Sequence, residues 1–211
     1  MSILSKEKIN VSRSCIGGGY NRGMILLTGA SASGKTEVAK MLRKNFGIVK
    51  AVTHTTRAPR AGETNGIDYH FVSDRDFLAG FDRGEFVEKT FYNGHYYGCS
   101  KKEVAENKCI VVDPHGLRSF LALKDPSVVT FYLEASEATR EKRMIHRGDK
   151  KEDIEKRLLN DRVDFAPSAI APTDFHIVTD DKTLEQIAQD VYSKYQSTLK
   201  ARKLGAVIVP K

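Results

Sequence analysis

An eight-residue stretch near the start of the chain has the glycines, lysine and hydroxyl group of a phosphate-binding loop. Residues 29–36 read GASASGKT and fit the pattern G-x-x-x-x-G-K-[ST] at every fixed position. The glycines let backbone N–H groups wrap a polyphosphate, while the positive end of the following helix faces the same anion. We expect the whole stretch to contact a nucleotide, through Gly29, Ala30, Ser31, Ala32, Ser33, Gly34, Lys35 and Thr36.

Two residues of this stretch have distinct expected roles in the chemistry. Lys35 would reach the β- and γ-phosphates of the nucleotide, and Thr36 would bind Mg²⁺. The apolar run 24–28 precedes the loop and a helix-like pattern follows it, which is the context that such loops need. A plain glycine-rich turn is the alternative, and this context argues against it. The loop indicates a nucleotide but does not say which reaction it serves.

A second group of polar residues lies in the stretch 55–72, which reads TTRAPRAGETNGIDYHFV. Arg57 and Arg60 flank a proline, so a stiffened loop could present both guanidinium groups to one phosphate. Glu63 is near enough in sequence to orient one of them, and Tyr69 offers a hydroxyl donor. Judged by residue types alone, a basic surface loop is an equally good interpretation.

These residues need a scaffold, and strand-like and helix-like runs alternate along most of the chain. Such alternation favours an α/β fold, in which a parallel sheet has helices on both faces. The predicted strands are 24–28, 49–53, 109–113, 128–133 and 175–179. The predicted helices are 35–46, 101–107, 115–124, 136–146, 151–163 and 183–199.

Two segments interrupt this alternation. Residues 54–98 are rich in Gly, Tyr, Phe and Arg, with short strand candidates at 69–72 and 85–92. They predict a lobe inserted beside the carboxyl edge of the sheet, where ligands of such folds bind. The charge-rich stretch 140–162 predicts a helical lid over a phosphate site. A solvated helical face is the alternative interpretation of this second segment.

Length and composition predict one globular domain. Of the 211 residues, 40% are hydrophobic and 29% are charged, which is ordinary for a soluble protein. We expect the domain at 23–199, between a flexible extension at 1–22 and a tail at 200–211. No apolar run approaches the roughly 20 residues that a membrane span needs, so we expect no membrane contact.

The net charge of +7 suits either nucleic acid or small polyanionic substrates. Because no basic stripe interleaves with aromatic residues, we expect no nucleic acid. The irregularly spaced cysteines predict neither a disulfide framework nor a metal site, and the reducing cytoplasm is the simplest location. They are Cys15, Cys99 and Cys109.

The stretch 55–72 resembles the guanylate kinase family at every fixed position of the block T-T-R-x-P-R-x-G-E-x-x-G-x-D-Y-x-F-V. The family also carries F-x-E and then a tyrosine–glycine pair, which occur here at 86–88 and 97–98. The resemblance extends over 24–197. It implies a P-loop NTPase-type parallel sheet flanked by helices, with an inserted GMP-binding lobe and a helical lid. It also implies Mg²⁺-dependent phosphoryl transfer from ATP to GMP or dGMP, within purine nucleotide metabolism.

The resemblance assigns the GMP site residue by residue. Glu88 would accept hydrogen bonds from guanine N1 and N2, and Thr53 keeps the hydroxyl of a serine that touches guanine in the family. A carboxylate suits guanine because guanine offers two adjacent N–H donors, which adenine lacks. The GMP phosphate would be bound by Arg57, Arg60, Tyr69 and Tyr97, with Glu63 beside them.

The resemblance also assigns residues near the transferred phosphate. Asp113 matches an acidic residue near the nucleotide and the metal, and Arg147 and Arg157 match lid arginines that fold over the transferring phosphate. With Lys35 and Arg57, these two arginines form the implied catalytic set. Phosphoryl transfer needs positioning and positive charge rather than covalent help, and the GMP phosphate is already an anionic nucleophile. No general base is therefore expected.

Two positions depart from the family pattern. Cys99 stands where the family usually has a serine that hydrogen-bonds guanine. Since a thiol is a weak donor, we expect Cys99 to contact guanine with reduced affinity. Val111 stands where the family tends to have an aspartate, which removes one polar contact near the acceptor or the metal.

Two other functions stay open at this point. A related P-loop kinase could use a different phosphate acceptor, although the block at 55–72 and Glu88 favour a guanine nucleotide. A guanylate-kinase-like binding module without catalysis is the other candidate. Such modules typically lose the phosphate-binding loop, whereas Gly34, Lys35 and Thr36 are intact here. We expect ATP and GMP or dGMP as partners, and either a monomer or a homodimer.

Overall fold

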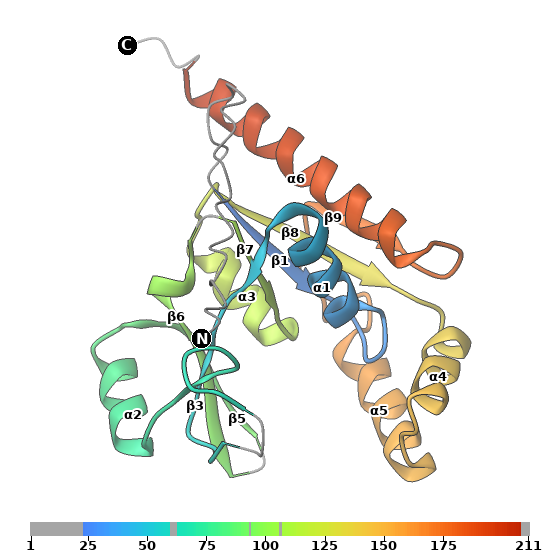
Figure 1. Cartoon of the computed structure of the whole chain (residues 1–211), viewed down its shortest axis with the longest axis horizontal. Coiled ribbons are helices and arrows are strands. Elements are labelled where there is room, and N and C mark those ends of the chain that lie inside the picture. Colours follow the sequence, from blue (N-terminus) through green and yellow to red (C-terminus); the bar gives the residue numbers. More distant parts are fainter. Residues whose placement is uncertain (1–22, 60–62, 93, 106, 208–211) are drawn as a thin grey trace, which may run out of the picture.

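The structure, a computed structural model, describes residues 23–59, 63–92, 94–105 and 107–207. The predicted extension at 1–22 lies outside these residues, and so does Arg60. Figure 1 shows three parts: a central sheet with helices on both faces, a lobe with a smaller sheet, and a projecting pair of helices. Among the described residues, no helix is both long and apolar enough to cross a bilayer.

The central sheet has five parallel strands in the order β2-β7-β1-β8-β9. All five residues of β1 are buried, as expected for a central parallel strand that is covered on both faces. The prediction of a parallel sheet flanked by helices is confirmed, although β2 is shorter than the predicted 49–53. In sheet order, the strands span Val49–Lys50, Lys108–Val111, Met24–Thr28, Val128–Glu134 and Phe175–Val178.

Two helices, α1 (Lys35–Phe46) and α6 (Leu184–Val207), cover one face of this sheet (Figure 1). Ile25 of β1 points into the core that they form, together with residues of β8. From α6, the fully buried Tyr195 donates its hydroxyl hydrogen to the carbonyl oxygen of Gly23, immediately before β1, at 2.5 Å. The last helix of the described chain is therefore fixed to the start of its first strand.

The helix α3 (Pro114–Ala122) covers the opposite face. Met24 and Leu26, which alternate with the residues facing α1, pack against Leu117 and Phe120 of α3 in a second core. The period of two along β1 thus divides its side chains between two cores. Because both cores depend on β1, the position of the loop that follows this strand is strongly determined.

The lobe contains a four-stranded sheet in the order β4-β3-β6-β5. Its strands β3 and β6 and its helix α2 (Asp74–Asp82) were not predicted from the sequence. The hydroxyl of Ser73 caps α2 by accepting a hydrogen bond from the backbone N–H of Asp76 at 3.0 Å. In sheet order, the strands span His70–Phe71, His54–Thr55, His95–Ser100 and Phe86–Tyr92.

The projecting pair consists of α4 (Glu137–His146) and α5 (Lys151–Asp164), close to the bounds predicted for both helices. The two helices share a small core of their own, made by Met144, Ile154 and Leu158. Figure 1 shows the pair and the lobe projecting from the same edge of the central sheet, on opposite sides of the phosphate-binding loop.

The predicted helix at 101–107 is wrong. Only a single 3-10 turn forms, at Lys101–Glu103. Asn107 has a φ of 55°, a left-handed conformation that a right-handed helix cannot contain. In addition, the Glu103 carboxylate accepts a hydrogen bond from the backbone N–H of Val52 at 2.8 Å and another from the Lys108 ammonium at 2.6 Å. The segment is thus a polar connection between lobe and sheet rather than a helix.

Candidate active site

The phosphate-binding loop, residues 29–34, links β1 to α1 and depends on its two glycines. Gly29 has a φ of 147°, and a Cβ there would lie only 2.2 Å from the carbonyl oxygen of Leu133. Gly34 has a φ of 99° at the N-terminus of α1, where it provides no capping side chain. The first-turn N–H groups of α1 are thus left to an anion rather than to a side-chain cap.

Lys35 is folded back onto this loop. Its ammonium group donates to the carbonyl oxygens of Gly29 at 2.6 Å and Ala30 at 2.7 Å, and more weakly to Ser33 Oγ at 3.4 Å. Burial lowers the pKa of Lys35 to about 8. A polyphosphate in the loop would oppose this effect, because negative charge favours the protonated amine.

A pocket of about 650 Å³ lies beside the loop, and we refer to it as the loop pocket. Lys35 and Thr36 line one side of it, and Arg143 and Arg147 of the α4 region line the other. Leu184 and Ile187 of α6 add an apolar wall. The loop pocket therefore combines cationic groups for phosphates with an apolar surface on which a base could pack.

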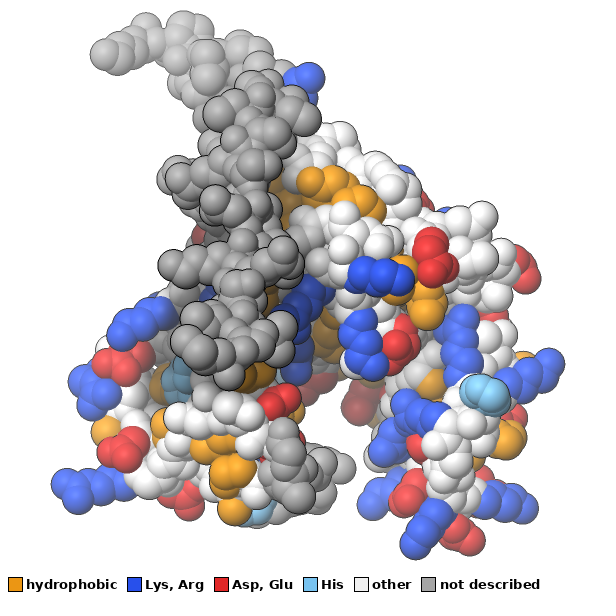
Figure 2. Space-filling model, in the orientation of Figure 1, with side chains coloured by type: hydrophobic (Ala, Val, Ile, Leu, Met, Phe, Trp, Pro, Cys, Tyr) orange, Lys and Arg blue, Asp and Glu red, His pale blue; other side chains and the backbone are white. Residues whose placement is uncertain are grey.

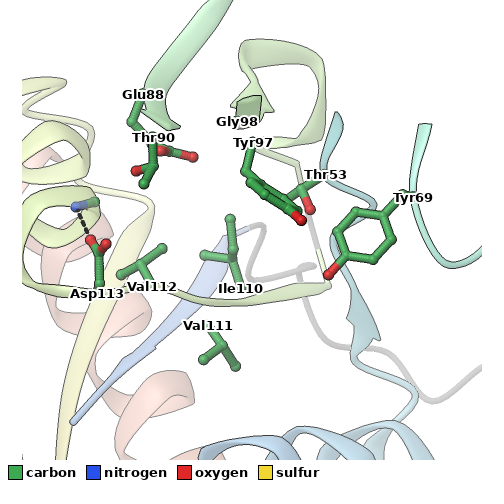
Figure 3. A pocket seen from close by; sticks show the side chains of 11 residues that line it. Thr53, Tyr69, Glu88, Thr90, Tyr97, Gly98, Ile110, Val111, Val112 and Asp113 are labelled. Carbon is green, nitrogen blue, oxygen red and sulfur yellow. Dashed lines mark hydrogen bonds between the residues drawn. The ribbon is translucent and has the colours of Figure 1, made fainter. Parts of the chain in front are cut away.

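A second pocket, of about 260 Å³, lies between the lobe and the end of β7, and we refer to it as the β7 pocket (Figure 3). Figure 3 shows an apolar floor beneath polar side chains that come from the lobe. The floor consists of Ile110 and Val112, whereas the side chain of Val111, between them, points away toward the core under α1. The polar residues are Thr53, Tyr69, Glu88, Thr90, Tyr97 and Asp113.

Glu88 is the buried carboxylate of the β7 pocket. Burial raises its pKa to about 7, and the nearby Asp113 carboxylate acts in the same direction. The backbone N–H of Cys99 donates to Glu88 Oε1 at 2.9 Å and opposes this rise. The Thr90 side chain also hydrogen-bonds this carboxylate, and because Glu88 lines the pocket, a ligand with N–H donors could reach it.

Arg57 and two tyrosines gather at the other side of the β7 pocket. Glu63 holds the Arg57 guanidinium through both carboxylate oxygens, each at 2.9 Å. The guanidinium also lies 5.6 Å from the ring centre of Tyr69, which in turn meets Tyr97 edge to face at 6.2 Å. The structure thus brings three of the predicted phosphate-binding residues, Arg57, Tyr69 and Tyr97, together with Glu63, in a geometry suited to an anion.

Two aspartates, Asp113 and Asp149, hold groups of the candidate site in place. Asp113 lines the β7 pocket, and its Oδ1 also accepts from the backbone N–H of Gly116 at 2.7 Å, which caps α3. Asp149 was not predicted; it binds Arg147 through two contacts of 2.7 and 2.5 Å and lies 3.6 Å from Arg157. The two predicted lid arginines therefore share one carboxylate, which a transferred phosphate could replace.

Cys99 does not enter the β7 pocket, contrary to the prediction of a thiol contact with guanine. Its side chain is fully buried in the core on the α3 side of the sheet, and its Sγ donates to the carbonyl oxygen of Ser100 at 3.6 Å. Burial raises the pKa of this thiol to about 12. Cys99 lies opposite Glu88 in the β5–β6 pairing, and its thiol packs in the core that also contains Ile110 of the pocket floor, so depth rather than strand face keeps it out of the pocket.

We therefore expect Cys99→Ser to lower stability and leave the KM for GMP unchanged. A hydroxyl in place of the thiol would put a polar group in an apolar core, at a cost of about 1–2 kcal/mol. Thermal unfolding and GMP saturation curves measured on the same preparation check both statements. A several-fold lower KM for GMP would show that residue 99 contacts the base after all.

Three further residues at the phosphate-binding loop were missed from the sequence. Asp161 of α5 accepts from Ser31, and Arg140 of α4 pairs with Asp161 at 2.6 Å. Arg143 donates to the carbonyl oxygen of Ala32 at 3.1 Å. The contacts with Ser31 and Ala32 join residues more than 100 positions apart, so no local spacing could have indicated them.

Comparison with known proteins places this geometry in a family. A family model described as guanylate kinase matches residues 21–198. A guanylate kinase of Chlamydia trachomatis is 34% identical over 181 residues, covering 80% of this chain and 86% of that protein. One of Helicobacter pylori is 33% identical over 146 residues, covering 65% and 70%. The crystal structure of guanylate kinase from Anaplasma phagocytophilum superposes with a TM-score of 0.59 at 26% identity, covering 84% and 86%.

Proposed function

The chain belongs to the guanylate kinase family, whose reaction is phosphoryl transfer from ATP to GMP, and we propose that its two pockets each bind one of these nucleotides. The loop pocket would hold ATP, and the β7 pocket would hold GMP or dGMP. One observation carries this assignment: the phosphate-binding loop follows β1, and Asp113 follows β7, its parallel neighbour. Ligands of open α/β sheets bind at this shared carboxyl edge.

On the ATP side, Lys35 would bind the β- and γ-phosphates, and the backbone of residues 29–34 would wrap them. The contacts of its ammonium with Gly29 and Ala30 support this role, because they hold the positive charge at the mouth of the loop. The unoccupied N–H groups of the first turn of α1 would add further donors to the same anion.

We propose that Thr36 binds Mg²⁺ together with ATP. Its side chain lines the loop pocket beside Lys35, and a hydroxyl oxygen is the kind of ligand that Mg²⁺ prefers. Among the described residues, no group of three His, Cys, Asp or Glu side chains could hold a metal ion. This fits Mg²⁺, which protein usually holds by few groups while water and phosphates complete its shell. The ion would supply charge neutralisation for the transferred phosphoryl group.

On the GMP side, Glu88 would accept from guanine N1 and N2. Its burial against an apolar floor makes an unsatisfied carboxylate costly, so a base without adjacent donors would bind poorly. Thr53 lines the same pocket and would offer its hydroxyl to the base. The floor of Ile110 and Val112 would pack against the flat face of the ring.

The GMP phosphate would lie at Arg57, Tyr69 and Tyr97, with Glu63 orienting the guanidinium. In the transfer step, an oxygen of this phosphate attacks the γ-phosphorus of ATP, and the bond to the β–γ bridging oxygen breaks to release ADP. Arg147 and Arg157 would neutralise the charge of the group in flight, after leaving the carboxylate of Asp149.

We also propose that residues 54–98 form the GMP-binding lobe and 140–162 the lid of one domain at 23–199. Figure 2 shows an open hollow between the lobe and the α4–α5 pair, with Lys and Arg side chains gathered on the α4–α5 side. This distribution supports a lid that approaches bound phosphates. The cytoplasm, where GMP and ATP are available, is the location that we propose.

The acceptor assignment is tested by measuring ADP release with ATP, Mg²⁺ and a panel of GMP, dGMP, AMP, CMP and UMP. We expect turnover with GMP and dGMP only. Equal or faster turnover with AMP would contradict the role of Glu88, and no turnover with any acceptor would favour a binding module without catalysis.

A further inference from the structure

An almost completely buried ion pair joins the phosphate-binding loop to the α4–α5 pair. Arg140 of α4 and Asp161 of α5 meet at 2.6 Å, and their side chains are only 7% and 8% exposed. The Asp161 carboxylate also accepts two hydrogen bonds from Ser31, one from the backbone N–H at 3.0 Å and one from the hydroxyl at 3.1 Å. Arg140 completes the group with a longer contact of 3.4 Å to the carbonyl oxygen of Ser31.

The α4–α5 pair does not depend on this ion pair for its helix–helix contact. Met144, Ile154 and Leu158 form an apolar core between the helices, and an exposed ion pair of Arg162 with Glu137 joins them a second time. A buried ion pair adds little to stability compared with apolar residues of similar size. Its distinguishing property here is the contact with Ser31.

The loop needs such support from outside. Ala32 has a φ of 59°, a left-handed conformation that is unfavourable for a residue with a Cβ. The neighbouring Ser31 hydrogen-bonds Asp161 and Arg140. The carbonyl oxygen of Ala32 accepts a hydrogen bond from Arg143 at 3.1 Å. With the outer polar groups of Ser31 and Ala32 bound, the loop has little freedom to relax from the shape that wraps a phosphate.

We propose that Asp161, held by Arg140, is a positioning residue for ATP: it fixes the outer half of the phosphate-binding loop and keeps the lid helices in register with it. This inference rests on the proposed assignment of ATP to the loop pocket. Asp161 acts through Ser31 rather than by touching the nucleotide. Its negative charge also favours the protonated form of Lys35, in the same direction as a bound phosphate.

The test removes both charges together, in the double variant Arg140→Leu/Asp161→Leu, so that neither charge is left buried without a partner. We expect a melting temperature near that of the wild type. We also expect the dissociation constant of a fluorescent ATP analogue to rise by about ten-fold, because the variant loses the hydrogen bonds that hold Ser31. The KM for ATP should rise with it, while the KM for GMP stays within about two-fold.

The exposed pair provides a matched control in Arg162→Gln/Glu137→Gln. It joins the same two helices, but within the described part of the chain it forms no hydrogen bond or ion pair with the loop. We expect the ATP analogue to bind this variant as it binds the wild type, because exposed ion pairs contribute little. A loss of ATP affinity of equal size in both variants would overturn the proposal, since helix pairing alone would then explain it.

A folded Arg140→Leu/Asp161→Leu protein with wild-type ATP affinity would also overturn the proposal. If this variant does not fold, Ser31→Ala decides the matter, because it keeps the ion pair and removes one of the contacts of Asp161. We expect about three-fold weaker ATP binding there, and an unchanged dissociation constant would overturn the proposal. Since these affinities are measured without an acceptor, they stay informative even if GMP proves not to be the acceptor.

Discussion

Replacing Lys35 with alanine is expected to reduce kcat with ATP and GMP by at least about 10³-fold, with little change in the affinity for GMP. Lys35 is half-buried in the loop, and its ammonium lies within hydrogen-bond distance of two carbonyl oxygens that border the phosphate site. Alanine would leave the developing negative charge of the transferred group without its closest protein cation. Steady-state kinetics and GMP binding by calorimetry measure the two quantities separately.

The chain offers a matched control on the same helix. Lys40 is exposed and pairs with Glu37 at 2.8 Å on the outer surface of α1. Lys40→Ala removes the same charge from the same element, and we expect kcat and both KM values to stay within about two-fold of the wild type. If Lys35→Ala kept a tenth or more of the wild-type kcat, Lys35 would not have the role proposed for it.

Replacing Glu88 with glutamine is expected to lower kcat/KM for GMP by about 10²-fold. The ratio of kcat/KM for GMP to kcat/KM for AMP should fall as well. Glutamine keeps the shape of the side chain and can still accept from Cys99, but it presents an NH₂ group where the carboxylate offers a second acceptor. That group would face the N–H donors of guanine. Kinetics with GMP and AMP as acceptors measure both effects.

The pH profile distinguishes a lost charge from a lost contact. Because the pKa of Glu88 is raised to about 7, the KM of the wild type for GMP should rise as the pH falls below 7 and level off above about 8. The Glu88→Gln variant should lack this dependence. Glu85→Gln is the matched control on the same strand region, since Glu85 is exposed and bound to Arg83. It should keep the wild-type profile.

The same pKa predicts an opposite effect on stability. A folded-state pKa of about 7 exceeds the usual glutamate value of 4.5, so the folded protein binds the proton more tightly and loses stability as the pH rises from 4.5 through 7. Above pH 7 the buried charge of Glu88 is therefore unfavourable for folding. Glu88→Gln should melt no lower than the wild type at pH 8, which separates its catalytic defect from misfolding.

The central sheet and the phosphate-binding loop could be predicted because their signals are local. The apolar run 24–28, two glycines and a helical pattern lie side by side, and the predicted helix 35–46 has the bounds observed for α1. The lobe was harder, since β3 is only two residues long and pairs with β6 across about 40 positions. Short strands of this kind are specified by their partners rather than by their own sequence.

Other site features depend on which way a side chain faces. The pattern around residue 99 predicted a contact with guanine, but the thiol of Cys99 is fully buried and packs in the core beside Ile110. Asp161 stood in a charged stretch that resembles any solvated helix, and only the packing of α5 against the loop buries it. A sequence without its fold cannot distinguish a buried carboxylate from an exposed one.

The contact of Tyr195 with Gly23 has a consequence for the order in which the protein folds during synthesis. These residues are 172 positions apart, and the α6 side of the core that covers β1 includes Ile187, Val191 and Tyr195. The ribosome therefore makes the phosphate-binding loop early in the described chain but completes its supporting core only when α6 emerges. Nascent chains that end before α6 would leave part of one face of the central sheet covered by α1 alone, and the exposed remainder is the kind of apolar surface that chaperones bind.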